Sequence, residues 1–223
     1  MIPKIKFLFL LSYFIFFNQF FSNFSYCKTI AEKLGCDECH RFSKNEITKT
    51  APDLFFAGIK FKKTWLKRFL RKPEIIRPGG FSLDPNFLIG ATVKEHITVT
   101  LEEANLLVNF LMRLILEDFS VEKVNNTPLS KGEKAKSKIK FERTYGCTAC
   151  HQAINLARKP RGGISGPSLI NAGNRLKGNW IYDKLKNPKK YEIKSRMPIF
   201  KLSEDDLILL TKYLLGQKKE NIR

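Results

Sequence analysis

A short cysteine motif that occurs twice constrains this chain more than any other feature. Residues 36–40 read Cys-Asp-Glu-Cys-His, and residues 147–151 read Cys-Thr-Ala-Cys-His. In each copy the two thiols are about one helical turn apart, and a histidine directly follows the second thiol. Four of the five cysteines belong to these motifs. Their spacing therefore argues against a general framework of disulfide bonds.

The pattern is the attachment signature of c-type haem. Two thiols at this spacing can form thioethers to the two vinyl groups of one porphyrin, and the histidine then lies beneath the ring, where its imidazole can bind iron. We therefore expect two covalently bound haem c groups. The residues that would bind them are Cys36, Cys39 and His40 in the first copy, and Cys147, Cys150 and His151 in the second.

Two other uses of a Cys-x-x-Cys pair explain less. A zinc site would combine two pairs that are more than a hundred residues apart, and it would leave both histidines without a role. A thioredoxin-like redox site needs a strand–helix–strand context, which neither flank shows. The haem interpretation accounts for all six residues.

The two halves of the chain are also similar outside the motifs. Residues 51–54 (Ala-Pro-Asp-Leu) align with residues 166–169 (Gly-Pro-Ser-Leu), and Trp65 aligns with Trp180, at one offset of 115. The last leucine-rich segments align at an offset of 103, so the first repeat holds twelve extra residues before its last helix. We expect each repeat to form one haem domain.

Helices are predicted throughout, and no alternating strand pattern exceeds about four residues. Thr100 and Ser203 are typical N-caps, each with an acid three residues later, Glu103 and Asp206. The predicted fold class is all-α. The expected helices cover residues 28–35, 64–72, 131–146 and 179–187, together with the two segments that follow the caps.

These features resemble the class I cytochrome c family in its two-domain dihaem form. The resemblance is based on both cysteine motifs, on residues 166–169, on Arg-Met-Pro at residues 196–198 and on the closing leucine-rich helices. It implies two tandem cytochrome c-like helical haem domains and one-electron transfer. It also implies that the carbonyl groups of Pro52 and Pro167 accept hydrogen bonds from His40 and His151, which orients each imidazole.

The domain boundaries follow from the repeat and from the polar stretch between its copies. Residues 1–27 precede the repeat, and residues 28–118 form the first domain. The linker is expected at residues 119–131, and the second domain at residues 132–223.

The sixth iron ligands differ between the repeats. Met197, in a loop before a proline, lies where the family has its distal methionine, whereas Met112 is expected in the core. Residues 77–99 contain no methionine, and His96 is the only histidine outside the motifs. We expect His96 to bind the iron of the first haem. An open or water-bound iron and ligation by Lys94 are the alternatives.

The N-terminal segment predicts export. Residues 1–27 hold two lysines, no acid and an apolar run at residues 7–17, which is shorter than a membrane span. A cleaved signal peptide fits this pattern. An uncleaved anchor, which would attach the protein to the membrane, and a lipid on Cys27 are the alternatives. The expected location is periplasmic, or the extracytoplasmic face of the membrane.

The net positive charge of the chain indicates which kinds of partner it would bind. Without residues 1–27 the chain has 38 Lys and Arg against 21 Asp and Glu, a net charge of +17. Export argues against nucleic acid as a partner. We expect acidic redox-partner proteins or a membrane respiratory complex instead.

Two classes of function fit these observations. The first is electron transfer in a respiratory chain, as a soluble carrier or as a subunit of a complex. The alternative is a dihaem enzyme, similar to a peroxidase or a thiosulfate dehydrogenase, that acts at an open or unusually ligated first haem. The ligands of the first haem discriminate between them, because catalysis needs an accessible iron.

Overall fold

The computed structural model is mostly helical, with one small antiparallel sheet. It describes residues 29–85, 87–89, 96–119, 124, 125, 127–192 and 195–222. Helices therefore dominate, as predicted. The predicted export segment (residues 1–27), Lys94 and part of the predicted linker lie outside the described residues.

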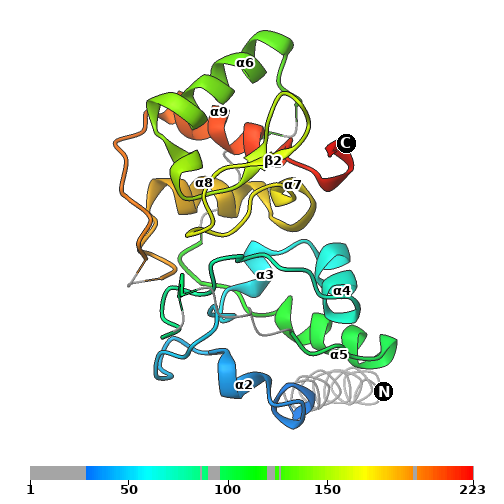
Figure 1. Ribbon diagram of the computed structural model, residues 1–223. Helices are drawn as coiled ribbons and strands as arrows, with labels where there is room; N and C mark the ends of the chain where they lie inside the picture. Colours follow the sequence, from blue (N-terminus) through cyan, green and yellow to red (C-terminus); the bar gives the residue numbers. More distant parts are fainter. Residues whose placement is uncertain are drawn as a thin grey trace, which may run out of the picture.

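The helices form two groups, which are stacked in Figure 1 with α2 to α5 below α6 to α9. In the first half, residues 29–33 are helical, followed by α2 (Cys36–Cys39), α3 (Ala57–Lys60), α4 (Lys63–Arg71) and α5 (Leu101–Leu111). The second half contains α6 (Lys131–Ile139), η1 (Lys140–Thr144), η2 (Cys147–Ala149), β1 (Ala153–Ile154), β2 (Pro160–Arg161), α7 (Ala172–Arg175), α8 (Gly178–Lys186), α9 (Glu204–Leu215) and η3 (Lys219–Asn221).

The repeat read from the sequence is a structural repeat. Helices α3 and α4 begin and end 115 residues before α7 and α8, and α5 begins 103 residues before α9. The twelve extra residues of the first repeat therefore lie between α4 and α5.

Two helices begin with a capping box. Thr100 accepts a hydrogen bond from the backbone of Glu103, and the Glu103 carboxylate accepts one from the Thr100 backbone. Ser130 and Glu133 form the same arrangement at the start of α6. Each box satisfies amide groups that a helix terminus leaves without partners.

The cap of α9 differs from this arrangement. Ser203 accepts from the backbone of Asp206, as predicted, but the Asp206 carboxylate accepts from Tyr145 Oη and from Lys140 Nζ at 2.5 and 3.0 Å. This carboxylate therefore ties α9 to η1 instead of completing a capping box.

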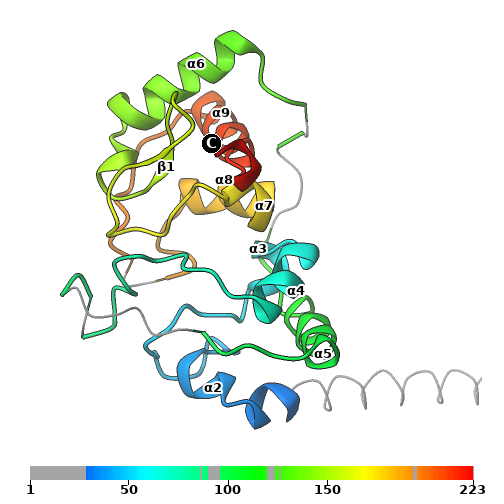
Figure 2. The ribbon, with the colours of Figure 1, turned by 45° about the vertical axis from the view of Figure 1, so that its right-hand side comes forward.

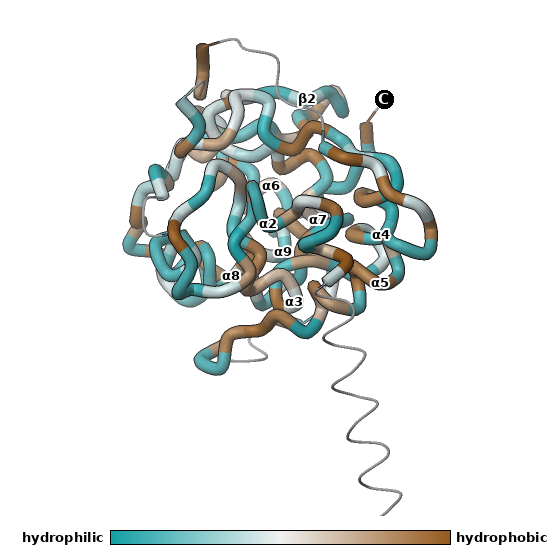
Figure 3. The backbone as a smooth tube through the Cα atoms, turned by 90° about the horizontal axis from the view of Figure 1, so that it is seen from below, coloured by the Kyte–Doolittle hydropathy of each residue, from teal (hydrophilic) through white to brown (hydrophobic). Residues whose placement is uncertain are grey.

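One hydrophobic cluster of buried residues runs through both halves and includes the buried faces of both last helices. Helix α5 packs on α4, while α9 packs on α6, α7 and α8. The tube in Figure 3 alternates between hydrophobic and hydrophilic residues along most of its length, as amphipathic helices require. The buried faces of the last helices comprise Leu107, Phe110 and Leu111 in α5, and Leu207, Leu210, Tyr213 and Leu214 in α9.

One of the contacts between the two halves is a short antiparallel stretch of backbone, which we call the junction. Its centre is a β-bridge between Phe61 and Leu176, which occupy equivalent positions in the repeat. Figure 2 shows α3 next to α7 and α8 at this point.

The hydrogen bonds of the junction are reciprocal. Lys62 donates its backbone N–H to Arg175 O (2.8 Å), and Lys177 donates its own to Lys60 O (2.9 Å). The side chains repeat the exchange, since Lys62 Nζ donates to Gly173 O and Lys177 Nζ donates to Gly58 O, both at 2.6 Å. A shift of 115 residues maps each donor and acceptor of one half onto the equivalent donor and acceptor of the other half. The contact therefore has local two-fold symmetry.

Helices α3 and α7 each contain a glycine at the equivalent position, because the backbone of another segment approaches each helix closely there. Gly58 N–H donates to Leu114 O, and Gly173 N–H donates to Gln217 O, both at 2.8 Å. A Cβ atom at Gly173 would overlap Leu215 O. These contacts hold the end of each last helix against the short helix of its own half.

We expect Gly173→Ala to destabilise the second half by about 1–3 kcal/mol, because the added methyl group meets backbone that cannot move freely. The matched control is Gly132→Ala in α6, where a Cβ meets nothing within 4 Å. That change should stabilise by about 0.5–1 kcal/mol. Urea unfolding measures both changes, and equal stability of the two variants would contradict the close approach.

Candidate functional site

The two cysteine motifs adopt the same local structure. Each begins after a glycine with positive φ, 67° at Gly35 and 58° at Gly146. Each then forms a single helical turn, in which the histidine backbone N–H donates to the carbonyl of the first cysteine, at 2.9 Å in the first half and 3.0 Å in the second. Both motifs therefore project two thiols and one imidazole from a single turn.

All four motif cysteines carry free thiols. Cys150 is exposed, and the other three are half-buried. Burial is the main reason why the pKa of Cys147 rises to about 11 and the pKa of Cys36 is also raised. Partly accessible thiols at this spacing fit thioether formation.

The histidines are held by the prolines that the family resemblance implied. His40 Nδ1 lies 2.6 Å from Pro52 O, and His151 Nδ1 lies 2.7 Å from Pro167 O. Since a carbonyl oxygen can only accept, each Nδ1 carries the proton and each Nε2 keeps its lone pair. Burial is the main cause that lowers the pKa of both histidines. A neutral imidazole with a free Nε2 is the form that binds a metal.

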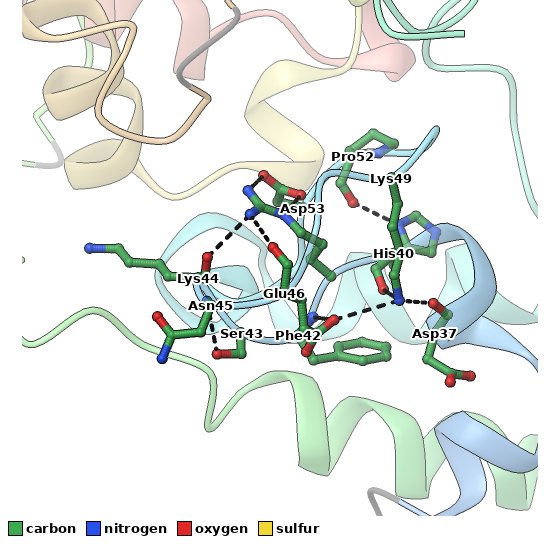
Figure 4. Close-up of polar contacts among 11 residues, drawn as sticks. Asp37, His40, Phe42, Ser43, Lys44, Asn45, Glu46, Lys49, Pro52 and Asp53 are labelled. Atoms are coloured by element: carbon green, nitrogen blue, oxygen red, sulfur yellow. Dashed lines mark hydrogen bonds and ion pairs between the residues drawn. The ribbon is translucent and has the colours of Figure 1, made fainter.

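A second contact supports His40 in the first half. Arg41 Nε and Nη2 donate to the two carboxylate oxygens of Asp53, at 2.7 and 2.5 Å. Arg41 directly follows His40, and Asp53 directly follows Pro52, so the pair joins the two ends of the histidine–proline loop. Figure 4 shows this loop, with the Pro52 carbonyl directed at the imidazole.

The equivalent positions of the second half are Gln152 and Ser168, which are uncharged and cannot form such an ion pair. Four more residues separate His151 from Pro167 than separate His40 from Pro52, and the hairpin of β1 and β2 lies in this longer loop. The hydrogen bond from Leu169 N to Gln152 O (2.8 Å) matches that from Leu54 N to Arg41 O (2.9 Å). The backbone frame is therefore repeated, and the side-chain support is not.

The structure places His96, the predicted sixth ligand, near His40. The ring centroids are 6.2 Å apart and the rings are tilted by 46°. His96 Nδ1 lies 2.9 Å from Ile97 O, which leaves its Nε2 free as well. The ring of Phe69, at 5.1 Å, packs on the other side of His96.

The distance between the His40 and His96 rings can be compared with the distance between two imidazoles that bind one metal ion. An imidazole–metal bond is about 2 Å long, as in zinc sites, and a nitrogen lies about 1.1 Å from the centroid of a five-membered ring. Two imidazoles on opposite sides of one metal ion thus have centroids about 6.3 Å apart. The observed separation of 6.2 Å between His40 and His96 is close to this value.

The two methionines differ in their surroundings. Met112 ends α5 and packs against the core, which fits its expected role as a core residue. Met197 is half-buried in the loop before α9 and contacts the edge of the core. Its backbone N–H donates to Ser195 Oγ at 3.3 Å.

Two functional side chains were missed from the sequence. Arg41 and Asp53 are an ordinary Arg and Asp by type, and neither belongs to a motif. A signal was present, since each directly follows a residue of the histidine–proline pair. Only in the structure are they found within hydrogen-bond distance of each other.

No family model, curated protein or solved structure matches this chain. Within the described ranges, the structure contains no helix that is long and apolar enough to cross a membrane. The interpretation of the site therefore depends on the geometry of its own residues.

We expect Asp53→Asn to loosen the loop around His40, because it leaves Arg41 half-buried without its counter-charge. Breaking the pair should cost about 2 kcal/mol locally, which corresponds to roughly 30-fold faster exchange of the Leu54 amide. Hydrogen–deuterium exchange of residues 41–54 measures this change.

The control is Glu142→Gln, which removes a half-buried ion pair with Lys138 at helical i, i+4 spacing and should cost less than about 0.5 kcal/mol. Residues 152–169 should exchange at the same rate in both variants. Unchanged exchange at Leu54 in Asp53→Asn would show that the ion pair does not hold this loop.

Proposed function

We propose that this chain is an exported dihaem c-type cytochrome that transfers single electrons between redox partners in a respiratory chain. The observation that carries this proposal is the repeated unit of a cysteine pair, a histidine and a proline carbonyl, present in both halves with hydrogen bonds of 2.6 and 2.7 Å. We further propose that residues 28–118 and 132–223 are two tandem class I cytochrome c-like domains.

Each half provides the groups that a covalently attached haem needs. The cysteine pairs would hold the two porphyrins, and His40 and His151 would bind iron through Nε2. Pro52 and Pro167 orient these rings and fix their tautomer, which raises the basicity of each imidazole toward a metal. Bound haem would supply an iron that takes up and releases one electron.

The remaining ligands distinguish the two centres. In the first half His96 would complete the coordination, and its 6.2 Å separation from His40 supports this role. Met197 would do so in the second half. A thioether ligand raises the reduction potential relative to a second imidazole, so electrons would enter at the first haem and leave from the second.

The position of His96 favours electron transfer over catalysis. An enzyme that acts on a substrate at iron needs an open coordination position, and an imidazole on each side of the metal closes it. The net charge of +17 outside residues 1–27 supports docking to an acidic redox partner. Residues 1–27 would direct export or anchor the chain to the membrane.

Covalent attachment is the first test. Expressed with a c-type haem maturation system, the wild-type chain should gain the mass of two haems. A variant with both Cys36→Ser and Cys39→Ser should keep only the second haem, because each half builds its own site, and the matching variant at Cys147 and Cys150 should keep only the first. Mass spectrometry of the denatured protein measures all three.

The control is Cys27→Ser, which should retain both haems. A wild-type chain that carries no haem, or that binds zinc in its place, would refute the proposal. Loss of both haems from either double variant would refute independent sites.

His96→Ala tests the closed first centre. Removal of the imidazole should open one coordination position, so that one haem becomes high-spin and binds carbon monoxide while the other stays unchanged. Absorption and electron paramagnetic resonance spectra measure the spin states.

The matched control is Met112→Leu, a change at a methionine of the first half that packs against the core, and it should leave both spectra unchanged. If the wild-type protein already contains one high-spin haem that His96→Ala does not alter, the first iron is open. The enzyme hypothesis would then replace electron transfer.

A further inference from the structure

Four basic side chains gather at the junction, and we call them the junction cluster. Two of them, Lys60 and Arg175, end α3 and α7 at equivalent positions of the repeat. Lys184 comes from α8, and Arg77 comes from the segment after α4. Arg175 is 4% exposed and the other three are half-buried.

The neighbours of the cluster are mostly uncharged. Arg175 donates to Asn171 Oδ1 and Ser168 O, and Lys184 donates to Pro188 O. Within the described part of the chain, no carboxylate oxygen lies within 4 Å of these four charges. Aromatic rings face the other two cations: Phe56, Phe61 and Trp180 surround Lys60 Nζ at 4.8–5.3 Å, and Phe81 lies 5.0 Å from the Arg77 guanidinium.

Two carboxylates lie farther away and do not balance the cluster. Glu192 interacts electrostatically with Lys60, Arg77 and Lys184. Glu74 acts on Arg175, but it also accepts hydrogen bonds from Trp65, Asn171 and Lys219. The junction therefore holds more positive than negative charge.

This excess positive charge is energetically unfavourable when the protein has no bound anion beside it. Burial is the main cause that lowers the pKa of Arg175 to about 9, that of Lys184 to about 8, and that of Lys60 well below its usual range. Desolvating an unpaired cation costs several kcal/mol, so such groups normally have an anionic partner.

The cluster interacts electrostatically with both candidate iron ligands. Lys60 is the cation that acts on His40, whereas Arg77, Arg175 and Lys184 act on His151. Arg77 thus belongs to the first half but acts on the histidine of the second.

Backbone hydrogen bonds hold the Arg77 segment in this position. Ile76 O accepts from Ser168 N at 2.7 Å, and Gly79 N donates to Ile164 O at 3.1 Å. Ser168 directly follows Pro167, which orients His151. The segment therefore packs on the loop that builds the second site.

We propose that the junction cluster binds the propionate carboxylates of both haems, and that Arg77 serves the haem of the opposite half. This inference rests on the proposed function. Each haem c carries two propionates, so two haems bring four carboxylates to four cations. Carboxylate is the anion that arginine binds best, in a two-pronged arrangement. In this role the cluster is a shared binding site, and filling it would stabilise the contact between the halves.

The test uses the full-length chain with both haems attached, in three variants. Arg77→Gln removes the charge, Arg77→Lys keeps it, and Arg71→Gln is the control on the exposed face of α4. A redox titration gives the midpoint potential of each haem, and the variants that carry a single haem assign the two potentials.

We expect Arg77→Gln to favour the oxidised form of the second haem by about tenfold, which is about 59 mV toward lower potential for a one-electron couple. The first haem should shift less. Arg77→Lys should restore most of the potential, and Arg71→Gln should leave both unchanged. Lys184→Gln provides a second neutral variant, with the same expected direction, in case Arg77→Gln does not fold.

Other outcomes would overturn the inference. Equal potentials in Arg77→Gln and Arg71→Gln would mean that Arg77 does not serve the second haem. Equal shifts in Arg77→Gln and Arg77→Lys would assign Arg77 a purely structural role. In both cases, two covalently attached haems would leave the proposed function intact. A wild-type chain without haem would overturn both.

Discussion

The reciprocal hydrogen bonds of the junction join equivalent segments of the two halves. Phe61 and Leu176 form the centre of the contact, and the lysine that follows each one donates both its backbone N–H and its Nζ to the opposite half. Because the donors are equivalent positions of a repeat, one local geometry is used twice. The same contact places the ends of α3 and α7, and with them Lys60 and Arg175, next to each other.

The two candidate centres share a frame and differ in their support. In both halves a proline carbonyl holds the proton of the imidazole on Nδ1, which leaves Nε2 for a metal. The first half adds the Arg41–Asp53 ion pair and places His96 near His40, with ring centroids 6.2 Å apart. The second half relies on a longer loop and on the packed segment around Arg77. In the proposed function, this difference would give the two haems unequal potentials.

Burial of charge connects the junction to the sites. A cluster of partly buried cations would normally weaken a contact between two halves, because each desolvated charge is unfavourable without a partner. In this chain the surplus interacts electrostatically with the two histidines that would bind iron. Haem propionates would pair with these cations, and the resulting attraction would be shared by both halves.

The sequence alone determined the features that depend on local spacing. These features are the two cysteine motifs, the offset of 115, the N-cap of α5 and the buried face of α9. The sequence predicts them because turns, caps and helical faces involve residues close in the chain. Three other features were decided only by the tertiary structure. They are the ion pair of Arg41 with Asp53, the distance from His40 to His96, and the cluster of Lys60, Arg77, Arg175 and Lys184. Each joins segments separated by a loop, by the extra residues of the first repeat or by the junction, and no local pattern fixes such distances.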